Sequence, residues 1–161
     1  MSARAKAAVG SILFLAVAPG VMGGLIPWLL TGWDAAGAVP WWQAGAGWAL
    51  VAAGSAALLS AFARFVVEGV GTPAPVAPTQ HLVVGGLYRY VRNPMYVAVA
   101  STIIGQALIL DRPGLLLYAV AFMAVVWSFV RFYEEPVLRA RYGAEYDAYR
   151  RAVPGWWPRV R

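Results

Sequence analysis

Four long apolar runs dominate this chain of 161 residues. They cover residues 7–30, 43–63, 95–110 and 114–133, and they contain almost no ionisable side chains. A helix that crosses a bilayer needs about 20 predominantly apolar residues, and 61% of this chain is hydrophobic whereas 12% is charged. The runs therefore predict an all-α, polytopic membrane helix bundle with about four transmembrane helices, folded as a single domain over residues 1–161.

The basic residues lie almost entirely at one end of these runs. Arg112 lies between the third and fourth runs, and the other 12 of the 13 Lys and Arg residues lie at the opposite end. Cytoplasmic loops carry an excess of Lys and Arg, so we expect a protein of the cell inner membrane with both termini and the active site in the cytoplasm. The first run is longer than the roughly 7–15 residues of a signal-peptide core, so we expect a retained helix.

Composition excludes several kinds of site. The chain has no cysteine and a single histidine, His81. Disulfides, a thiol nucleophile and a zinc site with several Cys or His ligands are therefore excluded, and we expect no metal centre. The net charge of +6 is spread along the flanks of apolar runs, which favours membrane lipids and not nucleic acid as the partner.

A polar segment, residues 80–96, separates the second run from the third and reads QHLVVGGLYRYVRNPMY. Gly85 and Gly86 allow backbone conformations that other residues avoid, and they allow a ligand to approach closely. Pro94 can start the third helix after Asn93. Ionisable residues at a membrane span often mark a functional site, but arginines in such a loop can also simply contact lipid phosphates. Composition alone leaves both interpretations open.

A second polar cluster, Glu134 and Glu135, follows the fourth run. Adjacent carboxylates repel each other unless a cation is near, and Arg131 can reach either of them at helical spacing. A cationic ligand could supply further charge, and the alternative is an ordinary ion pair at a solvated helix end. We also expect Pro136 to move Glu135 out of helical geometry and to bend the helix there.

The C-terminal stretch, residues 134–151, has a helical pattern with one aromatic stripe. The stripe lies opposite several arginines and consists of Leu138, Tyr142, Tyr146 and Tyr149. Such a pattern predicts an amphipathic helix, which we expect on the cytoplasmic side. The stripe either packs on the membrane surface or the bundle, or it covers a bound ligand.

From Gln80 to Pro158 the chain resembles the isoprenylcysteine carboxyl methyltransferase and phospholipid methyltransferase family of integral membrane methyltransferases. The resemblance rests on the order of Q-H-L-V, G-L-Y, R-N-P-M-Y, an apolar hairpin, E-E and Y-G-A-E-Y-D-A-Y-R-R-A-V-P. It implies an enzyme that takes S-adenosylmethionine from the cytosol and methylates a lipophilic acceptor entering from the bilayer. Residues 70–161 would form the methyltransferase core, and residues 1–69, which show no family motif, would form a helical hairpin that shapes the acceptor pocket.

The resemblance also implies roles for individual residues. The cofactor would contact Gln80, His81, Leu82, Val83, Tyr88, Asn93, Pro94, Met95 and Tyr96. Glu134 would hold the charged amino-acid end of the cofactor, and Arg131 would contact the acceptor. An amine or hydroxyl acceptor would need a proton taken up, for which Glu135 and His81 are the candidates. Many family members have R-H-P where this chain has Arg92-Asn93-Pro94.

Two other functions are also compatible with the sequence. Membrane sterol and steroid reductases, which use NADPH, have a similar C-terminal pattern, but they are longer, and this chain lacks an added basic site for the 2′-phosphate. A small four-helix transporter or scaffold would place polar residues at mid-membrane, where the third run offers Ser101, Thr102 and Gln106. The class of the acceptor and the oligomeric state are left open.

Overall fold

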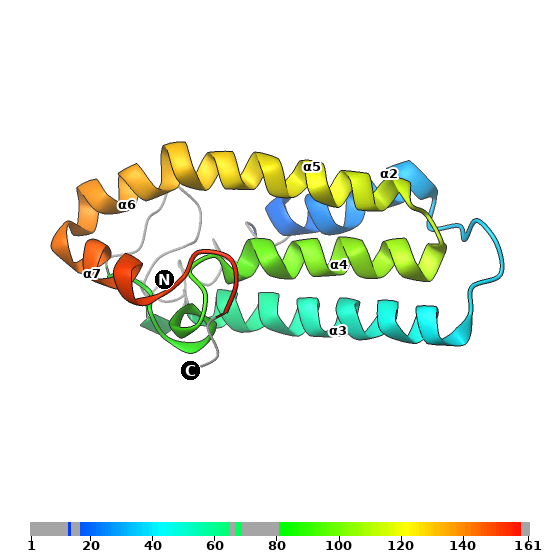
Figure 1. The fold of residues 1–161 in the computed structure, drawn as a ribbon, viewed down its shortest axis with the longest axis horizontal. Coiled ribbons are helices and arrows are strands. Elements are labelled where there is room, and N and C mark those ends of the chain that lie inside the picture. The colour runs from blue at the N-terminus through cyan, green and yellow to red at the C-terminus, as the bar shows by residue number, and fades with distance from the viewer. Residues whose placement is uncertain (1–12, 14–16, 65–66, 69–80, 159–161) are drawn as a thin grey trace.

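The computed structural model describes residues 13, 17–64, 67–68 and 81–158, and every regular element in these ranges is helical (Figure 1). In chain order the elements are η1 (Val21–Leu25), α2 (Ile26–Thr31), α3 (Trp41–Arg64), η3 (Gly86–Arg89), α4 (Pro94–Leu110), α5 (Gly114–Phe129), η4 (Val130–Glu134), α6 (Glu135–Tyr142) and α7 (Ala144–Ala152). The predicted all-α fold is therefore confirmed for the described residues.

Within the described residues, two helices are long and apolar enough to cross a membrane. One is α3, and the other is the continuous helix Gly114–Tyr142, which α5, η4 and α6 form together. The helices at the other two predicted spans are shorter and cover Val17–Thr31 and Pro94–Leu110. Large apolar side chains along α5, such as Leu117 and Val120, are about 70% exposed, as expected of a surface that faces lipid.

Helices α3 and α4 pack closely because small residues face each other. A Cβ atom added to Gly105 would lie 2.6 Å from the Gly47 carbonyl oxygen, and one added to Gly54 would lie 2.7 Å from the Ala98 carbonyl oxygen. These distances leave no room for a side chain. Small residues at helix contacts are typical of membrane bundles, where close packing provides much of the attraction between helices.

This contact predicts an unequal response to adding one methyl group. Gly105→Ala is expected to destabilise the bundle by about 1–3 kcal/mol, the usual cost of overpacking a tight contact. Gly45→Ala is the matched control, because a Cβ atom at Gly45 meets nothing within 4 Å. Thermal unfolding in detergent measures both variants. Equal melting temperatures for the two variants would contradict the close contact.

Helices α4 and α5 form the predicted antiparallel hairpin. Asp111 ends α4 in the left-handed region, with φ of +52°. Ile103 of α4 and Leu115 of α5 are 0% and 1% exposed in a shared apolar core. At the turn, Gln43 of α3 donates from Nε2 to the Asp111 carboxylate at 3.1 Å, so α3 also holds this end of the hairpin.

Two widened π-helical turns, η1 and η4, each precede a proline. The Ile26 amide donates to the Val21 carbonyl before Pro27, and the Glu135 amide donates to the Val130 carbonyl before Pro136. Proline has no N–H and clashes with the carbonyl four residues earlier. One extra residue in the turn relieves both problems while the helix continues.

The π turn at η4 corrects one expectation from the sequence. Glu135 has φ of −60° and ψ of −44°, which is helical geometry, so the prediction that Pro136 would expel it from the helix was wrong. The wider turn accommodates the proline ring instead. As a result, Glu134 and Glu135 lie on one continuous helix with α5.

The polar segments gather at one end of the long helices. Figure 1 shows α6, α7, the loop before α4 and the segment after α7 grouped there. Residues 69–80, which include Gln80 and the proline-rich part of that loop, lie outside the described residues. This end of the bundle carries the candidate site.

Candidate functional site

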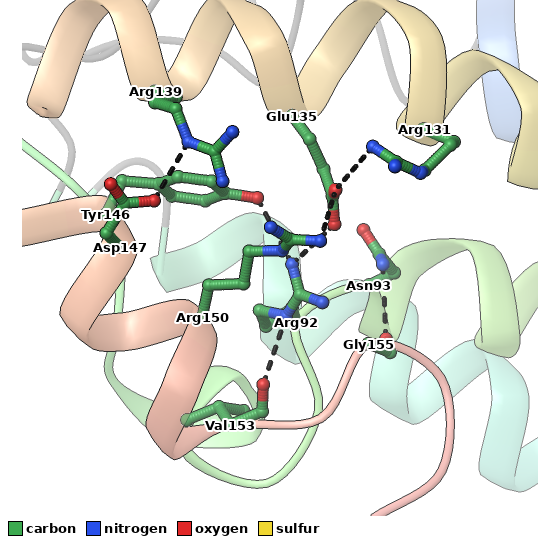
Figure 2. Close-up of polar contacts among 10 residues, drawn as sticks. All are labelled: Arg92, Asn93, Arg131, Glu135, Arg139, Tyr146, Asp147, Arg150, Val153 and Gly155. Carbon is green, nitrogen blue, oxygen red and sulfur yellow. Dashed lines mark hydrogen bonds and ion pairs between the residues drawn. The ribbon is translucent and has the colours of Figure 1, made fainter.

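Glu135 lies at the centre of a cluster of arginines (Figure 2). Its carboxylate pairs with Arg92 Nη1 at 2.7 Å, with Arg150 Nη2 at 3.4 Å and with Arg131 Nη1 at 3.9 Å. The side chains of Glu135 and Arg92 are 11% and 14% exposed. The cluster joins η4, the start of α6, the loop before α4, and α7, because each of these elements supplies one of its members. We call these four side chains the arginine–Glu135 cluster.

The Arg92-Asn93 turn also holds the segment that follows α7. The Arg92 amide donates to the Pro154 carbonyl at 2.9 Å, and the Asn93 amide donates to the Gly155 carbonyl at 3.2 Å. The side chains add two bonds, from Arg92 Nε to the Val153 carbonyl and from Asn93 Nδ2 to the Gly155 carbonyl, both at 3.1 Å. Asn93 is 7% exposed. Its amide group is therefore committed to holding the C-terminal segment.

The polar partners of Glu134 differ from those of Glu135. Glu134 Oε2 accepts a hydrogen bond from the Tyr96 hydroxyl at 3.2 Å, and no described Lys, Arg or His side chain lies within ion-pair distance of it. The side chain is partly buried. A buried carboxylate without a cation is costly, so Glu134 is well suited to bind the positive group of a ligand.

The segment His81–Tyr88 lies beside the end of α3. Val83 and Tyr88 are 5% and 6% exposed and pack with Ala61, whereas His81 is exposed. Neither backbone polar group of Val83 is hydrogen-bonded to a described residue. Buried backbone groups are nearly always paired, so we expect the partners of these two groups to lie beyond the described residues or on a ligand.

Helix α7 packs on the same segment through its tyrosines. The Tyr149 hydroxyl donates to the Tyr88 carbonyl at 2.7 Å, and the Tyr146 hydroxyl accepts a bond from Arg92 Nη1 at 3.1 Å. Burial raises the pKa of both tyrosines and that of Tyr88, so all three hydroxyls stay neutral at physiological pH. The packing interpretation of the aromatic stripe is supported for Tyr146 and Tyr149.

The structure brings most of the predicted site residues to this end of the bundle. Pro94 is buried at the first position of α4, Met95 packs against the cluster of Val83 and Tyr88, and Tyr96 contacts Glu134. Arg131 lies at the margin of the arginine–Glu135 cluster, and its side chain is 55% exposed. His81 has no contact with the acid pair, and Gln80 falls outside the described residues.

Three residues of this region were not assigned a role from the sequence. Arg92 and Arg150 belong to the arginine–Glu135 cluster, and Glu68 contacts the loop at Gly85. The spacing of Arg64 and Glu68, four residues apart in a helix, is a signal that could have drawn attention to Glu68. Arg92 gave no comparable local signal, because its partner Glu135 is 43 residues away.

A cavity of about 670 Å³ lies between the N-terminal helix, α3 and α4. We call it the N-terminal cavity; its lining includes Gly20, Val51, Leu58, Val99 and Ile109. Gln106 also lines it, but its side chain already bonds to the Gly23 carbonyl and to Trp33 Nε1. Val99 follows Tyr96 by three residues, about 4.5 Å along the helix. The cavity therefore reaches to within about one helical turn of Tyr96.

The described ranges contain no cluster of three His, Asp or Glu side chains suited to a metal ion. Glu134 has no ion pair with a described cation, and no described residue binds the Val83 backbone groups. Together with a nearby apolar cavity, they can instead hold an organic ligand with a positive group and an apolar partner molecule. This combination can bring two such molecules together.

Comparison with known proteins agrees with this geometry. No curated protein and no solved structure matches the chain significantly. The sequence profile of the family described as Phospholipid methyltransferase matches residues 42–145, well over half of the chain. The matched region includes α3, the Arg92-Asn93 turn and both acids. The chain therefore belongs to the phospholipid methyltransferase family, and this membership implies a membrane methyltransferase.

Proposed function

We propose that this protein transfers a methyl group from S-adenosylmethionine to a lipophilic acceptor that enters from the bilayer. The observation that carries the proposal is the unequal surroundings of the two acids. Glu135 is paired with three guanidinium groups, whereas Glu134 has only the Tyr96 hydroxyl among the described residues. Family membership supports methyl transfer, and Glu134 supplies the charge that an ammonium or sulfonium ligand needs.

The residues present fit this cofactor. Glu134 would bind its α-ammonium group, with the Tyr96 hydroxyl holding the carboxylate in place. The backbone groups of Val83, which no described residue binds, and those of its neighbour Leu82 would bind the nucleoside. The other enclosing residues would be His81, Tyr88, Asn93, Pro94 and Met95, with Gln80 preceding them. When bound, the cofactor supplies a methyl group on a positively charged sulfur, which an acceptor atom displaces in line.

For the acceptor we propose the N-terminal cavity as the site of the apolar chain. The cavity has the size of a ligand pocket, and its main polar side chain, Gln106, is engaged by protein groups. An apolar chain is therefore a better occupant than a polar head group. Alignment of two bound reactants can lower a barrier by about 7–11 kcal/mol in favourable cases, so positioning alone accounts for much of the catalysis.

Arg131 and Glu135 would act at the acceptor side. Arg131 is largely exposed and only weakly tied to Glu135 at 3.9 Å, so its guanidinium can contact an anionic group of the acceptor. Glu135 would hold Arg131 and Arg92 in place. Proton uptake by Glu135 would weaken its ion pairs with three arginines, so an acceptor that has no proton to lose, such as a carboxylate or a thiolate, suits this site best.

Transfer of a labelled methyl group tests the proposal directly. Purified protein is incubated with methyl-labelled S-adenosylmethionine and a native lipid extract, and mass spectrometry is expected to find a lipid that has gained the label. Glu134→Gln serves as the inactive control. Stabilisation by NADPH but not by S-adenosylhomocysteine, with no labelled lipid, would contradict methyl transfer and favour a reductase.

A further inference from the structure

Glu68, four residues beyond the end of α3, contacts the loop that precedes α4. Its Oε2 accepts a hydrogen bond from the Gly85 amide at 3.0 Å, across 17 residues of sequence. Its Oε1 pairs with Arg64 Nη1 at 2.7 Å, and the Glu68 side chain is 29% exposed. An exposed ion pair within one helix contributes little by itself. The hydrogen bond from the Gly85 amide, in contrast, fixes Glu68 to a distant part of the chain.

Gly85 and Gly86 of the loop allow this contact because neither residue has a side chain. A Cβ atom on Gly85 would overlap the Glu68 carboxylate, and one on Gly86 would lie 2.9 Å from Arg64 Nε. Gly86 also has φ of +58°, where other residues are strained. The two glycines therefore allow the backbone to lie directly against Arg64 and Glu68.

The same segment is fixed at its other end by α7. The Gly85 carbonyl accepts a bond from the Tyr88 amide at 3.1 Å, which starts η3, and the Tyr88 carbonyl accepts the bond from Tyr149 at 2.7 Å. Glu68 and Tyr149 thus hold the loop from two sides. Val83, whose backbone groups no described residue binds, lies two residues before Gly85, the residue that Glu68 holds.

We propose that Glu68 is a positioning residue for the cofactor site. By binding the Gly85 amide, it sets the orientation of the Leu82 and Val83 backbone groups that would bind the nucleoside. This inference rests on the proposed function. It predicts that Glu68 affects cofactor affinity more than the rate of methyl transfer from the bound state, because Glu68 itself does not touch the reacting atoms.

The test combines binding, kinetics and hydrogen exchange on Glu68→Ala. We expect the Kd for S-adenosylhomocysteine and the KM for S-adenosylmethionine to rise about tenfold, while kcat changes less than about twofold, the loss of one charge-assisted bond. In the ligand-free protein, the Gly85 amide is expected to exchange faster. Glu68→Gln, which keeps an acceptor oxygen, should restore most of the affinity. Glu145→Ala, an exposed acid of α7, is the matched control.

Several outcomes would overturn the inference. Unchanged affinity in Glu68→Ala, or a fall in kcat with unchanged KM, would show that Glu68 does not position the cofactor site. Unchanged exchange at Gly85 would show that the contact does not hold the loop. Failure of the unmutated protein to bind S-adenosylhomocysteine would instead refute the proposed function, and faster exchange at Gly85 in Glu68→Ala would still establish the contact.

Discussion

Replacing Glu134 with glutamine is expected to abolish measurable cofactor binding while leaving the protein at least as stable as before. Removing one partner of a buried charge pair costs about 3–5 kcal/mol, which corresponds to a loss of affinity of a hundredfold or more. The free energy of unfolding is not expected to fall, because no described cation forms an ion pair with Glu134. The substitution also removes a buried negative charge, which is costly to keep away from water. Titration calorimetry with S-adenosylhomocysteine and thermal unfolding in detergent measure the two quantities.

The neighbouring acid supplies the control. Glu135→Gln removes the central carboxylate of the arginine–Glu135 cluster, so its melting temperature is expected to fall, in contrast to that of Glu134→Gln. Tyr96→Phe, which removes the hydroxyl bonded to Glu134, should weaken cofactor binding by only about tenfold. Unchanged affinity in a folded Glu134→Gln protein would contradict the assignment of Glu134 to the ligand's positive group.

Replacing Arg92 with glutamine is expected to destabilise the protein by about 3–5 kcal/mol, the usual cost of breaking a buried ion pair from one side. The side chain bonds to Glu135, Tyr146 and the Val153 carbonyl. Without it, α7 loses the bond at Tyr146 and the following segment loses the bond at the Val153 carbonyl. Thermal unfolding measures the loss, and chymotrypsin cleavage after Tyr146, which is 2% exposed, reports the detachment of α7.

Arg139→Gln is the matched control for Arg92. Arg139 also pairs with an acid, Asp147 at 2.9 Å, but the two side chains are 52% and 37% exposed. Surface pairs of this kind contribute about 0–1 kcal/mol. If the two arginine variants lose equal stability, or if chymotrypsin cleaves both equally fast, the arginine–Glu135 cluster does not fasten α7.

The sequence located the helices well because hydrophobic runs alone define them. The run at 95–110 corresponds to α4, Pro94–Leu110, and the run at 43–63 to α3, Trp41–Arg64. Pro136 was expected to move Glu135 out of helical geometry, but Glu135 is helical and the helix continues to Tyr142. That error arose because the rule for residues before proline does not anticipate a π turn, which depends on packing along the whole helix.

The candidate site was only partly accessible from the sequence. The contact between Arg131 and Glu135 follows from helical spacing, and the structure gives it a distance of 3.9 Å. The stronger contact of Glu135 with Arg92 joins residues from different elements, and spacing carries no information about such pairs. For the same reason helical spacing did not distinguish the two acids, whose surroundings differ mainly in the long-range partners Arg92 and Arg150 of Glu135 and Tyr96 of Glu134.

The extra residue in the π-helical turn η4 determines the direction in which the side chains after it point around the helix axis. In a regular α-helix each residue advances the chain by about 100°, so the absence of that residue would rotate Glu135 by about this angle away from Arg92. A single-residue insertion or deletion between Gly114 and Glu134 is therefore expected to break the ion pair between Glu135 and Arg92. The length of this helix, and not its composition alone, encodes which acid meets the arginines.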